Sequence, residues 1–165
     1  MDAFPTRCPM RMLVRYFLAA ALLIGTGCAH RLIPGTDIER NDDTEAIVQL
    51  MERYRQAVEG RDAEAVMKLV SPEFRDNAGT STPDDDLTYQ SLPEALKTRF
   101  ENIDEVHLDV DVRDIEVRKE DASAVYYYTL RWRMPRLSNT AHSASELKRM
   151  EFKREAGLWK IVSGI

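Results

Sequence analysis

The side chains that could do chemistry in this chain are few and widely spaced. Two cysteines are present, Cys8 and Cys28, and cleavage before Cys28 would separate them. The processed chain would then have neither a disulfide nor a cysteine-based metal site. His30, His107 and His142 lie too far apart for a metal-ligand motif. The sequence therefore predicts no metal.

A long polar loop spans residues 77–90 (NAGTSTPDDDLTYQ). Connections of this length often form lids or mobile segments. Its run Asp84, Asp85 and Asp86 lacks the alternate spacing and the distal glutamate of an EF-hand, so we expect a solvated acidic loop. The chain also lacks a glycine-rich phosphate loop and a Gly-x-Ser-x-Gly elbow. We predict no cofactor.

Three aromatic residues recur on one face of a predicted strand. Tyr126, Tyr128 and Trp132 stand at even spacing, so their side chains point the same way. Core filling is the simplest role for them. Their flat faces and polar edges would also suit a small amphipathic ligand.

The first 28 residues have the order of an export signal. Arg11 and Arg15 precede an apolar run over 16–24, and small residues at 25–27 lead to Cys28. The apolar run is too short for the roughly 20 residues that cross a bilayer as a helix. An uncleaved anchor, or a cleaved signal with an incidental cysteine, are the alternatives.

The stretch IGTGC, residues 24–28, resembles a bacterial lipobox, with Gly25 where a leucine-like residue is usual. The resemblance implies a signal peptide over 1–27 and acyl chains, such as palmitate, on Cys28 that hold the protein at a membrane. Residues 28–43 would be a lipidated tether, and 44–165 the folded domain. In the enterobacterial pattern Ala29 favours the outer membrane over the inner one. We therefore expect a cell-envelope lipoprotein whose domain lies in the periplasm or outside.

Charge is divided unevenly along the chain. The net charge is −5, and because residues 1–27 carry +2, the rest carries −7. A surface of that sign repels phosphates, so we expect no nucleic-acid partner.

Helices come first in the pattern. Apolar residues recur at three- and four-residue steps from Thr44, which predicts a helix with Asp42 and Glu45 as its capping pair and Gly60 as its end. Asp62 would cap a second helix, and a capping box at Ser91 would begin a third.

Strands follow. Alternation over 106–112 changes phase before Ile115, which predicts a β-bulge near Arg113 and Asp114. Further strands are expected over 122–134, about 146–154 and 158–163. Helices first and strands after predict an α+β fold, with an antiparallel sheet curled over three helices.

Both ends of the predicted domain carry a resemblance. YRQAVEGRDAEAVMKLVSPEF (54–74) resembles the helix–turn–helix opening, and MEFKREAGLWKIVSGI (150–165) the closing hairpin, of the nuclear transport factor 2-like (SnoaL-like, cystatin-like cone) superfamily. The resemblance implies a cone with a pocket at its open end. It does not select a function, because the superfamily includes isomerases, dehydratases, hydrolases and binding subunits.

Ketosteroid isomerases in that superfamily use a tyrosine donor, an aspartate base and a protonated aspartate. Tyr54 matches the first position, Asp76 falls near the second, and counting back from Gly157 brings the third to Arg149. An arginine cannot act as a neutral acid there. The alternative, purely structural roles are a core aromatic for Tyr54 and a turn-capping carboxylate for Asp76.

We therefore expect a non-enzymatic domain that binds a small ligand or a protein partner, with a pocket formed by Tyr54, Tyr126, Tyr128 and Trp132. The alternative is an acid–base enzyme for a small apolar substrate, with Tyr54 and Asp76 as catalytic residues. A homodimer through the sheet is a third hypothesis, in which Arg131 and Arg133 face Asp109 and Asp111 of a second copy.

Overall fold

The structure is a computed structural model that describes residues 32–77, 86–134 and 138–165. The expected signal, Cys28 and loop residues 78–85 lie outside these ranges. The described chain contains three helices and two antiparallel sheets, in the order α2 (Asp42–Glu59), α3 (Ala63–Leu69), β1 (Arg75–Asp76), β2 (Leu87–Thr88), α4 (Leu92–Glu101), β3 (Glu105–Arg118), β4 (Asp121–Met134), β5 (Ser138–Glu155) and β6 (Leu158–Ser163). None of the described helices is both long and apolar enough to cross a membrane.

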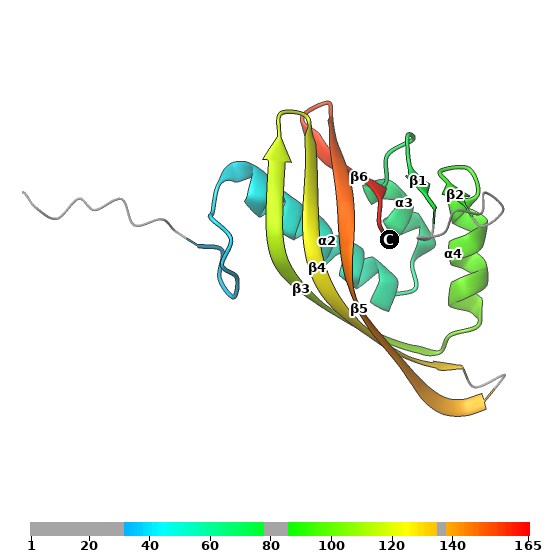
Figure 1. Ribbon diagram of the computed structural model, residues 1–165. Coiled ribbons are helices and arrows are strands. Elements are labelled where there is room, and N and C mark those ends of the chain that lie inside the picture. The colour runs from blue at the N-terminus through cyan, green and yellow to red at the C-terminus, as the bar shows by residue number, and fades with distance from the viewer. Residues whose placement is uncertain (1–31, 78–85, 135–137) are drawn as a thin grey trace, which may run out of the picture. The chain divides into compact units, whose positions relative to one another are not determined.

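The α+β prediction is confirmed. Strands β3 to β6 form a sheet in which each strand pairs with its neighbour in sequence. The sheet is strongly curved, and the helices lie on its concave side (Figure 1). Residues Ile47, Met51, Phe74, Phe152 and Ile161 are almost fully buried between the two layers.

The bulge predicted near Arg113 and Asp114 is present in β3. The pairing of β3 with β4 shifts between Val112 and Asp114. Two consecutive exposed residues, Arg113 and Asp114, interrupt the alternation of buried and exposed positions there. The apolar residues on both sides of the bulge therefore face the helices.

Two of the four predicted helix termini need correction. The N-cap of α2 is Asn41, not the expected Asp42–Glu45 pair. Its side chain accepts the Thr44 backbone N–H at 2.9 Å, while Thr44 Oγ1 accepts the Asn41 N–H at 3.0 Å. Glu45 instead pairs with Arg40 at 2.6 Å. Neutral side chains therefore accept both backbone N–H groups. The neighbouring acidic residues, which are also common caps, led the sequence prediction to the wrong pair.

The capping box expected at Ser91 does not form. Ser91 makes no side-chain bond to its own helix, and its Oγ accepts the Thr88 N–H at 2.9 Å. This bond ties β2 to the start of α4. The caps predicted at Asp62, whose carboxylate accepts the Ala65 N–H at 2.9 Å, and at Gly60 are both confirmed.

Strand β5 begins earlier than the expected residue 146, at Ser138. Its first half pairs with β4, for example Arg131 with Ser143, although residues 138–145 show no apolar alternation. The two-residue strands β1 and β2 are too short for any periodicity to reveal.

Part of the expected tether is folded. Ile33 and Ile38 are buried, and their backbones are joined by an N–H to O bond of 2.9 Å. The described residues before α2 therefore form a compact turn.

Candidate ligand-binding site

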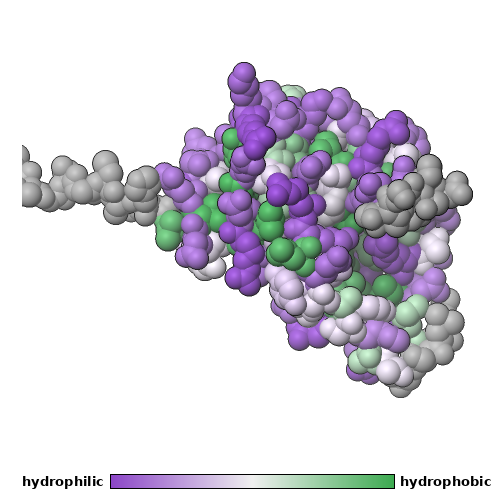
Figure 2. Space-filling view, viewed as in Figure 1, coloured by the Kyte–Doolittle hydropathy of each residue, from purple (hydrophilic) through white to green (hydrophobic). Residues whose placement is uncertain are grey.

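A cavity of about 300 Å³ lies on the concave side of the sheet, between the second half of α2, α4 and the middle strands. Its lining is mostly apolar, with three tyrosines and three charged residues: Tyr54, Val58, Asp76, Leu87, Leu96, Arg99, Phe100, Ile103, Val106, Leu108, Tyr126, Tyr128, Leu130, Lys148 and Ile165. In the space-filling view, apolar residues show at the surface between α4 and the sheet (Figure 2). The elements that curve around one another thus leave an apolar space between them.

Four of the residues singled out in the sequence line this cavity. Tyr54 comes from α2, Asp76 from β1, and Tyr126 and Tyr128 from β4. The expected fifth, Trp132, does not line it. Trp132 stacks on His142 of β5, with ring centroids 5.5 Å apart, where β4 and β5 continue beyond the cavity.

Tyr54 lines this space, and its hydroxyl is protonated. Burial raises its pKa to about 12, with a smaller opposing effect from the positive charge of Arg99 and a reinforcing one from Asp76. Its hydroxyl has no hydrogen-bond partner within the described residues. Tyr54 is therefore a donor that a bound molecule could use.

Asp76 is engaged by backbone at the far end of β6. Its Oδ2 accepts the N–H of Gly164 at 2.8 Å and that of Ile165 at 3.1 Å. The Tyr126 hydroxyl donates to the Gly164 carbonyl at 2.8 Å, and burial raises the pKa of Tyr126. These bonds hold residues 164–165 in place, and Ile165 forms part of the cavity wall.

Gly164 is the residue that this wall requires. Its φ is +86°, and a Cβ there would lie 2.0 Å from the Arg149 carbonyl oxygen. No other residue type fits without moving the β5 backbone.

Two cations at the cavity were not identified from the sequence. Arg99 of α4 and Lys148 of β5 both line it. The Lys148 ammonium lies 5.8 Å from the centre of the Tyr128 ring. The Tyr128 hydroxyl also donates to the Glu146 carboxylate at 3.5 Å. Burial is the main cause that raises the pKa of Tyr128, and the negative charge of Glu146 is the second.

The register of β5 corrects the expectation for Arg149. Arg149 pairs with Val125, so it lies on the opposite face from the cavity, where it donates to Ser123 Oγ at 2.9 Å. Its neighbour Lys148 pairs with Tyr126 and faces the cavity instead. The residue of β5 that faces inward at this point is therefore Lys148, a cation and not an acid.

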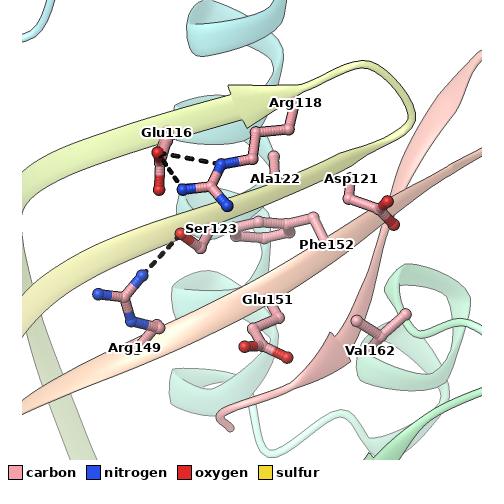
Figure 3. Close-up of a pocket in the computed structure, with 9 residues that line it drawn as sticks. All are labelled: Glu116, Arg118, Asp121, Ala122, Ser123, Arg149, Glu151, Phe152 and Val162. Atoms are coloured by element: carbon pink, nitrogen blue, oxygen red, sulfur yellow. Dashed lines mark hydrogen bonds and ion pairs between the residues drawn. The ribbon is translucent and has the colours of Figure 1, made fainter.

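The face of the sheet turned away from the helices, here called the outer face, has a concavity of about 340 Å³. Figure 3 shows it lined by side chains that already pair within the chain, Arg118 with Glu116 and Arg149 with Ser123. The inner cavity is more enclosed by apolar side chains, so it is the better ligand site.

The described ranges contain no cluster of three or more His, Cys, Asp or Glu side chains placed to hold an ion. His107 is half exposed and contacts Glu59 at 2.9 Å and Asp109 at 3.2 Å.

Solved structures share the fold of this domain. A ketosteroid isomerase-like protein from Erwinia carotovora atroseptica superposes with a TM-score of 0.62 at 15% identity, over 76% of this chain and 95% of that one. A nuclear transport factor 2-like superfamily protein from Salmonella enterica gives 0.62 at 16% identity, over 73% and 86%. The domain has the nuclear transport factor 2-like fold.

Other solved structures of this fold are described by other activities. A putative scytalone dehydratase from Novosphingobium aromaticivorans superposes with a TM-score of 0.60 at 12% identity, over 74% of this chain and 80% of that one. No protein-family model matches the sequence, and no curated protein matches it significantly. At these identities the nuclear transport factor 2-like likeness extends to the fold and not to the activity.

Proposed function

We propose that this chain is an envelope lipoprotein whose nuclear transport factor 2-like domain binds a small, largely apolar ligand without transforming it. The observation that carries the proposal is the inner cavity, in which apolar side chains surround a few polar groups. Cavities of this make-up commonly hold small molecules.

The state of Asp76 favours binding over catalysis. A general base needs a free lone pair directed at the substrate, and backbone N–H groups already occupy one oxygen of this carboxylate. Tyr54 stays protonated far above neutral pH because burial raises its pKa to about 12. Asp76 therefore has a structural use that needs no substrate, whereas the protonated Tyr54 hydroxyl could donate to a bound molecule in either function.

The alternative function is an acid–base enzyme that uses Tyr54 and Asp76. One observation favours it: both side chains line the same cavity. Proteins of similar structure include one described as ketosteroid isomerase-like and one as a putative scytalone dehydratase. Turnover of a small substrate that is abolished by Tyr54→Phe or Asp76→Asn would establish the enzyme.

Native mass spectrometry of the full chain, extracted gently from its own cells in detergent, tests the binding function. We expect a reproducible extra mass that is lost on denaturation. A bare protein mass under the same conditions would count against a ligand and favour a role in binding a protein partner.

The same spectrum tests the anchor. We expect the denatured wild-type mass to correspond to a chain that begins at Cys28 and carries acyl chains, and Cys28→Ser to lose both cleavage and lipid. More than one chain is expected, because a single acyl chain gives only marginal membrane binding. We propose the outer membrane as the site of anchoring.

We also propose a homodimer through the outer face. Tyr127 and Leu147 pair side by side on it and are 41% and 59% exposed, which favours an apolar contact. The four charged residues expected to pair between two copies have partners within one chain: Arg131 contacts Asp109 at 2.6 Å, Arg133 contacts Glu105 at 3.3 Å, and Asp111 contacts Arg113 at 2.6 Å.

A further inference from the structure

Unused hydrogen-bond donors gather at the inner cavity. In the part of the chain that the structure describes, the Tyr54 hydroxyl and the Arg99 guanidinium have no hydrogen-bond or ion-pair partner. The Lys148 ammonium has only the face of the Tyr128 ring, 5.8 Å from its centre. The cavity therefore offers a hydroxyl and two cations to whatever enters it.

These donors lie near one another. The charge of Arg99 acts on the hydroxyls of both Tyr54 and Tyr128, and Lys148 stands over the Tyr128 ring. Arg99 belongs to α4 and Lys148 to β5, so the two cations approach the tyrosines from two different layers of the domain.

The acceptors near the cavity are already engaged. Asp76 receives the N–H groups of residues 164 and 165, and the Gly164 carbonyl receives the Tyr126 hydroxyl. Glu146 lies close to the Tyr128 hydroxyl but does not line the cavity. A ligand that brought only donors would find few acceptors, whereas one that brought an anionic acceptor would find three donors.

We infer that the ligand is an amphipathic acid: an apolar body that fills the space lined by Leu96, Phe100 and Leu130, and one carboxylate bound by Arg99, Lys148 and Tyr54. This inference rests on the proposed binding function and adds the chemical class of the ligand. Hydrogen bonds in which both groups are charged are the strongest available to such a site.

Two matched probes test the inference, phenylbutyrate and its neutral analogue phenylbutanol. They share the aromatic ring and the alkyl chain and differ in the head group. Binding to the full chain in lipid nanodiscs is measured calorimetrically, with empty nanodiscs subtracted. We expect phenylbutyrate to bind roughly tenfold more tightly or better.

Single substitutions locate the effect. Arg99→Gln and Lys148→Gln should each weaken phenylbutyrate binding by about tenfold and leave phenylbutanol binding unchanged. Lys97→Gln and Arg149→Gln are matched controls, because each removes one cation from the same element without touching the cavity. Both controls should bind like the wild type.

The outcomes separate this inference from the function beneath it. Equal affinity for the two probes, or an unchanged preference in Arg99→Gln and Lys148→Gln, would overturn the acid while leaving a ligand-binding cavity. Failure of both probes to bind would overturn the small-ligand function as well.

Discussion

At the scale of single residues, Gly164 contributes both to the stability of the fold and to the shape of the cavity. It provides the N–H that Asp76 accepts and the carbonyl to which Tyr126 donates. These two bonds hold Asp76, Tyr126 and Gly164 in position together. A substitution at one of them should therefore displace the other two.

Gly164→Ala should destabilise the domain strongly, by about 2–4 kcal/mol, because a left-handed backbone and a clash with the Arg149 carbonyl add together. Urea unfolding measures the loss. Gly157→Ala is the control: its φ is +82°, but its Cβ would meet nothing within 4 Å. That variant should lose only about 1 kcal/mol. Equal losses in the two variants would contradict the clash.

Tyr54 should make the protein less stable at high pH. Burial raises its folded-state pKa from 10.0 to about 12, so the stability it contributes is fully present below pH 10 and is lost as pH rises toward 12. Tyr54→Phe should reduce this loss by on the order of 2 kcal/mol in unfolding measured across that range. A variant with the same pH profile as the wild type would show that the hydroxyl is hydrated.

The sequence predicted part of this site and missed part of it. Tyr54, Asp76, Tyr126 and Tyr128 could be found because period and resemblance place them on inward faces. Arg99 and Lys148 could not, since a charged residue on a helix or strand is usually solvated. Residues before Lys148 in β5 lack apolar alternation, so only pairing with β4 reveals which face it occupies.

At the scale of elements, β3 is an edge strand of the sheet, and a side chain from α2 covers part of that edge. Glu59, at the end of α2, accepts the backbone N–H of Leu108 at 2.9 Å and also contacts His107. Charged residues Asp109, Asp111 and Arg113 follow along the strand. An edge treated in this way resists pairing with other strands.

Glu59→Ala should remove the hydrogen bond from the Leu108 N–H to the Glu59 carboxylate. We expect a loss of about 1–2 kcal/mol and faster hydrogen exchange at the Leu108 amide, because its N–H would be left without an acceptor. Glu52→Ala is the matched control on the same helix, since it also loses a contact with Arg55 but touches no strand. Unchanged exchange at Leu108 in Glu59→Ala would mean that water replaces the carboxylate.

The helices and long strands were predictable because their apolar faces repeat over many residues. The caps of α2 and α4 were less so, since Asn41, Thr44 and Ser91 sit among other residues that could serve equally well. Which residue caps a helix depends on the conformation of the residues before it. For Ser91 it depends on the hydrogen bond with Thr88 of β2.

At the scale of the whole molecule, the proposed dimer depends on an apolar centre in the outer face. Tyr127→Asp with Leu147→Asp should convert a dimer to a monomer in sedimentation velocity, because two carboxylates would be buried against their copies. Leu158→Asp is the control, as Leu158 is 66% exposed but lies at the β5–β6 turn. A wild-type protein that remains monomeric at high concentration would contradict the dimer.

The bond between Asp76 and Gly164 joins residues 88 positions apart. Within the main sheet each strand pairs with its neighbour in sequence, so the hairpins can form as the chain emerges. The bonds to residues 164 and 165 cannot form until β6 has been synthesised. We therefore expect a nascent chain halted before β6 to hold helices and hairpins with no enclosed cavity, so that the ability to retain a ligand arises in the last step of folding.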